Sequence, residues 1–357
     1  DTRIRASLPT LRRLLEAGAR VVVVSHLGRP KGARRAELTL RPVAQRLAEL
    51  LGTGVSFCEE CVGPAAQAAV AELGDGQLLL LENLRFHAAE EQNDPDFARA
   101  LAALADAYVN DAFGTAHRAH ASTAGVPKLL AQVAAGDLLK SEIDHLGVVR
   151  TPKRPLLVLL GGAKVSDKLA VLEALAPHAD VLAIGGAMSY TFLAARGEPT
   201  GSSLTEPARI EDARRVEEAA RAAGRRLLLP SDHVVAQRAE AGAPTRVVRE
   251  IPDGWMGVDI GPETAKRYAE ELRAARTAFW NGPMGIFEIP AFARGTEQVA
   301  AAAAESEAVT VVGGGDSLAA INQLGLARRI GHLSTGGGAS LEYVQGLELP
   351  GIAALER

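Results

Sequence analysis

The chain has 357 residues, which is enough for about two domains of ordinary size. It is 47% apolar and 23% charged with a formal net charge of -4, a globular balance that argues against a nucleic-acid-binding protein. The sequence shows no signal peptide and no run of about 18 apolar residues, so we expect a soluble, cytoplasmic protein without a membrane partner. The two cysteines, Cys58 and Cys61, are expected to be free thiols, because two glutamates lie between them.

The first half of the chain alternates helices, apolar strands and polar loops. In chain order, helices are expected over residues 4–17, 42–51 and 95–104, and strands over residues 20–24, 78–81 and 107–109. This rhythm predicts a parallel sheet covered by helices.

Basic residues follow the strands of this half. Ligands of such sheets bind outside the carboxyl ends of the strands. Those ends carry His26, Arg29, Arg85, His117, Arg118 and His120, and Arg3 could join them from the first helix. A single arginine is usually a solvated surface charge, but three successive strand ends with arginine indicate a basin for a small, multiply anionic metabolite. No metal-ligand spacing accompanies the histidines, so a zinc site is not expected.

A domain boundary is expected at residues 150–155, where prolines bracket a basic stretch after a helix over residues 138–149. The second half repeats the architecture, with strands expected over residues 156–160, 181–184, 227–229, 278–280, 309–312 and 332–334. Most of these strands run into glycines, which leave room for a flat base and let phosphates approach bare backbone.

The clearest ligand-binding signal is the segment 156–169, LLVLLGGAKVSDKL. Its strand breaks at two glycines, and a helix is expected over residues 165–175. Lys164 and Lys168 would then lie one turn apart on one face, where two ammonium groups and a helix N-terminus suit a polyphosphate. An ordinary strand–helix turn with solvated lysines explains this stretch, taken alone, equally well.

A single carboxylate, Asp316, lies among glycines before another expected helix. It should repel a phosphate unless a cation lies between them, so we interpret it as a magnesium ligand; a helix N-cap is the alternative. The phosphate-loop pattern GxxxxGK[ST] is absent, and no GxGxxG with a later acidic partner follows a strand. A GDSL hydrolase is not supported either, because no base and orienting acid accompany Ser317.

The motifs together resemble the phosphoglycerate kinase family. They are DTRIRASLP, SHLGRPKG, LLENLRFH, VNDAFGTAHRAHAST, GGAKVSDK, WNGPMGIFE, GGGDS, STGGGASLE and LPGIAAL, in the family's order. The resemblance implies two doubly wound α/β lobes, each a parallel sheet flanked by helices, joined by a hinge helix. Residues 1–150 would form a triose-binding lobe, with residues 343–357 packing back on it, and residues 151–342 a nucleotide-binding lobe.

The resemblance also implies the activity. A monomer would transfer the acyl phosphate of 1,3-bisphosphoglycerate to ADP, reversibly and with Mg²⁺, giving 3-phosphoglycerate and ATP. Since an acyl phosphate is already a high-energy donor, transfer would be direct and in line after the lobes close.

Carried over motif by motif, the resemblance implies individual roles. The triose-binding positions are Arg3, His26, Leu27, Gly28, Arg29, Arg85 and Arg118. The nucleotide-binding positions are Gly162, Lys164, Lys168, Gly185, Gly186, Gly257, Val258, Asn281, Pro283, Glu288, Gly314, Gly315, Asp316 and Ser317.

Within these sets, some roles are more specific. The positions implied to be catalytic are Arg3 and Lys164, on the transferred phosphoryl group, with Gly337 and Gly338 in the loop beside it. Lys168 is implied to bind nucleotide phosphate oxygens, Glu288 the ribose, and Asp316 the magnesium ion. The adenine cleft is implied to comprise Gly162, Gly185, Gly186, Gly257 and Val258. Ser317 stands where the family often has threonine, and it keeps the hydroxyl.

The family pattern has about thirty more residues before Asp1, including a first strand, and a βαβ unit likewise needs a parallel strand before the first helix. We therefore expect this chain by itself to bind ADP but to turn over poorly. Two other classes stay open: a non-catalytic nucleotide-binding relic, and an unrelated kinase or binding protein for an anionic metabolite.

Overall fold

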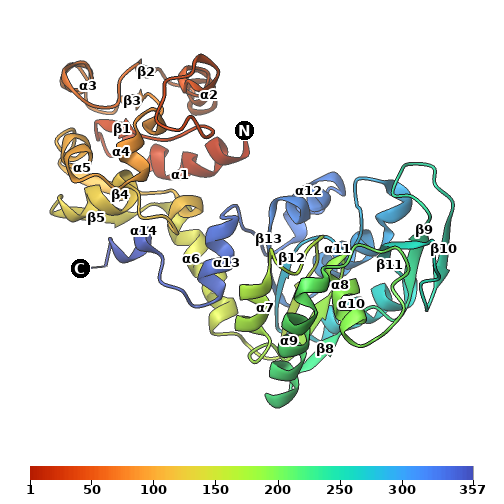
Figure 1. Ribbon diagram of the computed structural model, residues 1–357. Helices are drawn as coiled ribbons and strands as arrows, with labels where there is room; N and C mark the ends of the chain where they lie inside the picture. Colours follow the sequence, from red (N-terminus) through yellow and green to blue (C-terminus); the bar gives the residue numbers. More distant parts are fainter. Residues whose placement is uncertain (357) are drawn as a thin grey trace. The chain divides into compact units, whose positions relative to one another are not determined.

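The computed structural model describes residues 1–356, and the chain divides into two compact units (Figure 1). Unit 1 comprises Asp1–Ile143 and the segment from Glu348, and unit 2 comprises Asp144–Leu347. The division falls within helix α6 (Asp137–Arg150), ahead of the expected boundary at 150–155. Residues 343–347 belong to unit 2, whereas the expected boundary lay at 342/343.

Unit 1 contains two parallel sheets. Three strands pair in the order β1 (Val21–Val23), β3 (Leu78–Leu81), β2 (Val55–Cys58), and β4 (Ala107–Asn110) pairs with β5 (Gln132–Ala135). The central strand β3 consists of four leucines that are at most 1% exposed, because it has a neighbour on each side and helices over its faces. The helices are α1 (Thr2–Glu16), α2 (Arg41–Leu51), α3 (Pro64–Ala71), α4 (Ala88–Glu91), α5 (Pro95–Ala102) and α14 (Pro350–Ala353).

The last helix, α14, belongs to unit 1 through backbone contacts. The Gly351 N–H donates to the Ala116 carbonyl at 2.8 Å, and Asn110 Nδ2 donates to the Gly351 carbonyl at 3.1 Å. A Cβ on Gly351 would lie 2.9 Å from Ala116 Cα, so this close approach requires glycine.

Unit 2 is built on a six-stranded parallel sheet in the order β14-β13-β12-β6-β7-β8. The strands are β6 (Leu156–Leu160), β7 (Val181–Ile184), β8 (Arg226–Leu228), β12 (Thr277–Asn281), β13 (Val309–Gly313) and β14 (His332–Leu333). From β6, the strands β7 and β8 follow outward in one direction, and the later strands β12, β13 and β14 follow in the other. The order therefore reverses between β6 and β12, and the crevice outside their carboxyl ends is where ligands of open α/β sheets bind.

Helices cover this sheet (Figure 1). They are α7 (Leu169–Leu175), α8 (Met188–Ala195), α9 (Ile210–Ala222), α10 (Pro262–Ala274), α11 (Arg294–Glu305), α12 (Gly315–Gln323) and α13 (Gly338–Val344). The core includes Trp280 and Tyr268, both fully buried. Strand β6 is buried at every position, which explains why its sequence is one continuous apolar run.

The sequence did not predict a second, antiparallel sheet in unit 2. It pairs β9 (His233–Ala236) with β10 (Thr245–Val248) on one side and β11 (Met256–Ile260) on the other. Strand β10 is an exposed edge whose Val247 is 54% exposed, so its sequence lacks the alternation that marks a half-buried strand.

The α/β class and the predicted strands are confirmed, most within one or two residues. The helix expected over residues 165–175 is wrong at its start, because α7 begins only at Leu169. Glu206 accepts hydrogen bonds from the Ser166 N–H at 3.1 Å and from Ser166 Oγ at 2.6 Å, which holds this stretch as a turn. Cys58 and Cys61 are free thiols, as predicted. Within residues 1–356, no helix has the length and apolar character needed to cross a membrane.

Candidate functional site

Unit 1 gathers five basic side chains near the carboxyl ends of its strands. We call Arg3, His26, Arg85, Arg118 and His120 the basic cluster. Burial is the largest cause that lowers the pKa of the His26 imidazole to about 4, followed by the charges of Arg85, Arg3, His120 and Arg118. His26 is therefore a neutral hydrogen-bonding group at neutral pH, set among charged arginines.

The buried Arg85 is held rigidly. It is 5% exposed, its Nη1 donates to the Gly28 carbonyl at 3.0 Å, and its Nε lies 3.4 Å from Glu91 Oε1. Arg29 is exposed and acts electrostatically on Arg85, so it lies near the same cluster. Restraint of this kind lowers the entropy lost when a guanidinium binds an anion.

The loop that carries Leu27 and Gly28 is fixed by one amide. Asn83 Nδ2 donates to the carbonyls of Leu27 at 2.8 Å and Leu38 at 2.9 Å. Gly28 has φ +67°, and a Cβ there would lie 2.8 Å from Leu38 Cδ2. Asn83 is not among the predicted site residues, although a turn-forming residue just after an apolar strand is a sequence signal for such a position.

A buried glutamate supports the loop that carries Arg118 and His120. Glu90 is 3% exposed and accepts from the Ser122 N–H at 3.0 Å and from Ser122 Oγ at 2.5 Å. His120 Nδ1 lies 3.9 Å from Glu90 Oε1, and Arg118 Nε donates to His117 Nε2 at 3.2 Å. No sequence pattern distinguishes Glu90 from the exposed Glu91 beside it, so only the fold shows that Glu90 supports this loop.

In unit 2, the turns that follow β6, β7 and β12 contact one another through backbone atoms, at the point where the strand order reverses. The Gly161 N–H donates to the Asn281 carbonyl at 3.0 Å, and a Cβ on Gly161 would lie 2.1 Å from the Pro283 carbonyl oxygen. Gly186, with φ +65°, would place a Cβ 2.5 Å from the Gly162 nitrogen. The turns after β6, β7 and β12 therefore touch through glycines, which leaves their backbone groups accessible to a ligand.

Lys164 and Lys168 lie in different environments, and both precede α7, so the expectation that they share a face of that helix is wrong. Lys164 is exposed in the turn before α7. Lys168 Nζ donates to Asn281 O at 2.6 Å and to Asn281 Oδ1 at 2.5 Å. Burial lowers the pKa of Lys168 to about 8, against the opposing effects of Asp316 and Asp167. Asn281 Nδ2 is buried without a hydrogen-bond partner and faces Gly314.

Asp316 lies exposed in the first turn of α12, close enough to act on Lys168. The N-cap of that helix is Gly314, with φ +90° and no side-chain cap, so the alternative that Asp316 is the N-cap is wrong. The neighbouring Ser317 is fully buried, and its Oγ accepts from the Gly282 N–H at 2.6 Å. The hydroxyl of Ser317 thus joins the turn after β12 to α12.

The remaining predicted site residues of unit 2 lie in four places. Gly257 and Val258 lie on β11, where Ser203 Oγ accepts from the Gly257 N–H at 2.9 Å. Glu288 is exposed in the loop after β12. Gly337, with φ +58°, and Gly338 are exposed at the start of α13. Gly185 packs against Met284, and a Cβ on Gly185 would lie 2.4 Å from the Met284 sulfur.

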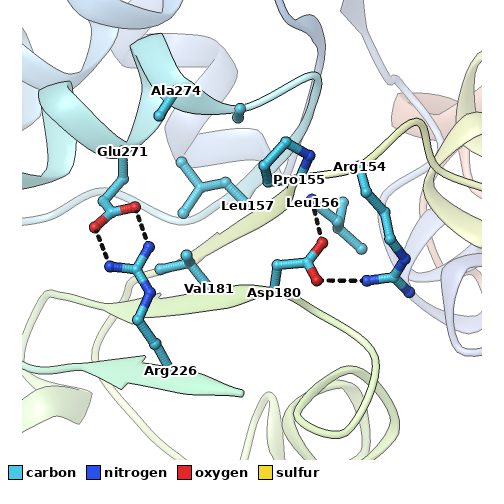
Figure 2. A pocket seen from close by; sticks show the side chains of 10 residues that line it. Arg154, Pro155, Leu156, Leu157, Asp180, Val181, Arg226, Glu271 and Ala274 are labelled. Carbon is cyan, nitrogen blue, oxygen red and sulfur yellow. Dashed lines mark hydrogen bonds and ion pairs between the residues drawn. The ribbon is translucent and has the colours of Figure 1, made fainter. Parts of the chain in front are cut away.

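A cavity of about 340 Å³ lies away from this edge, at the amino ends of β6, β7 and β8 (Figure 2). Its charged groups are paired. Arg226 makes two bonds to Glu271, at 2.8 and 2.6 Å, and Asp180 accepts from Arg154 and from the Leu156 N–H, both at 2.7 Å. These bonds stabilise the sheet, and each charged side chain that lines the cavity already has a partner.

Comparison with known proteins agrees with this arrangement. The phosphoglycerate kinase family model matches residues 1–347. The phosphoglycerate kinase of Moorella thermoacetica is 56% identical over 358 residues, covering 99% of this chain and 91% of the relative. That of Rubrobacter xylanophilus is 58% identical over 358 residues, covering 99% and 90%. The solved phosphoglycerate kinase of Coxiella burnetii has a TM-score of 0.92 at 39% identity, covering 99% of this chain and 90% of that one. The chain therefore belongs to the phosphoglycerate kinase family.

Proposed function

We propose that the two units share one reaction, with the phosphoglycerate bound by unit 1 and the nucleotide by unit 2. The reaction follows from family membership: the chain is a glycolytic phosphotransferase that passes the acyl phosphate of 1,3-bisphosphoglycerate to ADP, giving 3-phosphoglycerate and ATP. The observation that supports the division is that the basic cluster belongs wholly to unit 1 and the glycine-lined strand edge wholly to unit 2.

In unit 1, Arg85 and Arg118 are proposed to bind the carboxylate and phosphate groups of the triose, with Arg29 and Arg3 adding charge. Planar guanidinium groups match both kinds of oxyanion. His26, with its lowered pKa, donates or accepts as a neutral imidazole. Leu27 and Gly28 contribute backbone groups at the same loop, which Asn83 holds in place.

In unit 2, the phosphates are proposed to lie over the turns after β6, β12 and β13. Lys168 supplies charge there, and Asn281 Nδ2 supplies a donor that otherwise lacks a partner. The backbone positions proposed for the nucleotide are Gly162, Gly185, Gly186, Gly257, Val258, Pro283, Gly314 and Gly315, with Ser317 supporting the turn and Glu288 on the ribose.

The transfer step needs positive charge rather than a covalent intermediate. Arg3 and Lys164 are proposed to stabilise the equatorial oxygens of the moving phosphoryl group, together with the backbone N–H groups near Gly337 and Gly338. Both substrates must be held in line and water excluded. Each unit is proposed to hold one of the two substrates, so the transfer would require the units to close. That closure stays a prediction.

The residues of unit 2 fit a magnesium ion that is held chiefly by the nucleotide. Asp316 is exposed beside Lys168, and within residues 1–356 no group of three or more possible metal ligands occurs. Mg²⁺ commonly takes one or two carboxylates, with phosphate oxygens and waters completing its shell, so a lone aspartate is sufficient. When bound, the ion supplies positive charge to the phosphate oxygens.

We also propose that the protein acts in the cytoplasm as a monomer, without nucleic-acid or membrane partners. The net charge of -4 supports the first exclusion, and the missing membrane-spanning helix within residues 1–356 supports the second.

The test is a coupled assay of ATP formation from 1,3-bisphosphoglycerate and ADP, with calorimetry of ADP binding alongside. ATP formation that depends on both substrates is expected, even at a low rate. ADP binding without ATP formation would favour a nucleotide-binding relic, and activity with a different anionic substrate alone would favour an unrelated kinase.

A further inference from the structure

A buried carboxylate next to the proposed adenine cleft has no role in the reaction described above. Asp259 is 1% exposed, on β11. Its Oδ2 accepts from the Gly295 N–H at 2.6 Å, and its Oδ1 accepts from the Ile260 N–H at 2.9 Å. Both of its oxygens therefore bind backbone groups, one of them in the first turn of α11.

Two glycines make room for this carboxylate. A Cβ on Gly285 would lie 2.3 Å from Asp259 Oδ1, and a Cβ on Gly295 would lie 2.5 Å from the same atom. Gly285 belongs to the loop after β12 that continues to Glu288. The side chain of Asp259 thus fills a space bounded by the loop after β12 and by α11.

The backbone is irregular at the same place. The pairing of β11 with β9 shifts between Gly257 and Asp259, so Val258 has no partner in the register. Its carbonyl instead accepts from the Ile286 N–H at 3.0 Å. The bulge is therefore tied to the loop after β12 through Val258 and to α11 through Asp259.

We propose that Asp259 is a positioning residue for the nucleotide, whose ionised carboxylate holds the bulge at Gly257 and Val258 in the shape that binds ADP. This inference rests on the proposed placement of the adenine cleft. An ionised carboxylate accepts both N–H bonds at full strength, whereas the protonated acid turns one oxygen into a donor. Nucleotide affinity should therefore depend on the ionisation of Asp259.

The charges around Asp259 allow this ionisation to occur near neutral pH. Burial, with an added contribution from Glu297 of α11, raises the pKa of Asp259 to about 7 against the opposing effect of the N–H bonds from Gly295 and Ile260. Tyr190 of α8 also interacts electrostatically with Asp259. The other titratable groups on these elements are His233 of β9, Arg294 and Glu305 of α11, and Glu288 of the loop.

The test compares Asp259→Asn with the unchanged chain from pH 6 to 8. The amide places an NH₂ group against a backbone donor, so we expect the KM for ADP to rise about ten-fold at pH 8, with smaller changes in kcat and in the triose KM. The ratio of the two ADP KM values should fall toward one at pH 6, where the aspartate itself is protonated. Titration of the nucleotide cancels in this ratio.

Glu297→Gln is the matched variant, because Glu297 is exposed and lies outside the proposed sites. Removing its charge should lower the pKa of Asp259. The acid limb of ADP binding, which is the loss of ADP affinity as the pH falls, should then move to lower pH, with kcat at pH 8 unchanged. Calorimetry of ADP binding to both variants gives the same comparison without turnover, and thermal unfolding shows whether they are folded.

The proposal is overturned if the KM ratio is the same at pH 6 and 8, if the ADP and triose KM values rise equally, or if Asp259→Asn loses only thermal stability. It is also overturned if Glu297→Gln leaves the acid limb in place. Failure of the unchanged chain to form ATP would count against the proposed function, whereas normal ATP formation with these outcomes would count only against the role of Asp259.

Discussion

Lys168 donates from Nζ to both oxygens of Asn281, at 2.6 Å to the backbone carbonyl and at 2.5 Å to Oδ1. Asn281 ends β12 and Lys168 precedes α7, so these bonds join the two sides of the point where the strand order reverses. Because Oδ1 accepts from Lys168, Nδ2 is directed away from it, towards Gly314. One pair of residues thus presents an ammonium and an amide donor at the edge proposed for the phosphates.

The pH dependence of ADP binding should reveal Lys168. Burial lowers the pKa of its ammonium to about 8, so the free enzyme loses this charge as the pH rises through that value. We expect the KM for ADP to rise between pH 7 and 9 in the unchanged chain. Lys168→Arg keeps the charge throughout this range and should abolish the alkaline rise. Identical profiles for the two chains would mean that Lys168 does not act on the phosphates.

Lys164→Ala should cut turnover while leaving ADP binding nearly intact, because Lys164 is exposed in the turn before α7 and is free to follow the moving phosphoryl group. Loss of one preorganised charge at the transition state costs about 2.7–4 kcal/mol, a fall of about 10²–10³ in kcat. The assay measures kcat, and calorimetry measures ADP binding. Lys266→Ala, at an exposed position on α10, is the control, and near-normal turnover of Lys164→Ala would remove Lys164 from the mechanism.

Asp316→Asn should weaken binding of magnesium–ADP more than binding of free ADP. The carboxylate is needed only when the cation is present, and without the cation it repels the phosphates. Calorimetry with and without Mg²⁺ separates the two cases. Asp167→Asn removes another negative charge that acts on Lys168 and should show no such magnesium dependence. Equal losses in both conditions would show that Asp316 has no part in metal binding.

Arg118→Lys should raise the KM for 3-phosphoglycerate about ten-fold, equivalent to about 1.4 kcal/mol, and leave the ADP constant nearly unchanged. Lysine keeps the charge but cannot offer the planar fork, and it loses the geometry set by the bond to His117. Steady-state kinetics in both substrates are sufficient, with the exposed Arg99→Lys on α5 as control. A parallel rise in the two constants would place Arg118 outside the triose site.

Asp180→Ala should destabilise the protein without changing either KM. Asp180 accepts bonds from the Leu156 N–H, Arg154 and Arg225 at the amino edge of the sheet, and its loss leaves the buried Leu156 N–H unsatisfied, at about 1–3 kcal/mol. We expect the Tm to fall by at least about 2 °C. An unchanged Tm would contradict this role.

The stabilising effect of Asp180 should also depend on pH. Burial acts to raise its pKa, but the bond from Leu156 and the guanidinium of Arg154 lower it overall. A lowered pKa means that the stabilisation is present above the unfolded value of about 4 and is lost as the pH falls through the folded value. The difference in Tm between Asp180→Ala and the unchanged chain should therefore shrink in acid.

The α/β class, the position of β6 and the family could be predicted from local residue patterns. A parallel strand that is covered on both faces is apolar throughout, and LLVLL, bounded by Pro155 and Gly161, has that pattern. The motifs identify the family because each is a local run of the residues that the chemistry needs: arginines after strands, glycines where backbone approaches a ligand, and an aspartate in the first turn of α12.

Features that depend on residues far apart in the chain could not be predicted from any local pattern. Ser166 is held out of α7 by Glu206, forty positions later, and no local pattern records that bond. Lys168 and Asn281 are 113 positions apart, so their pairing, and the lowered pKa that accompanies burial of Lys168, follow from the strand order alone. Asp259 reads in the sequence as an ordinary polar residue. It is buried because two glycines from another loop and another helix leave it room, and burial is what moves its pKa towards neutrality.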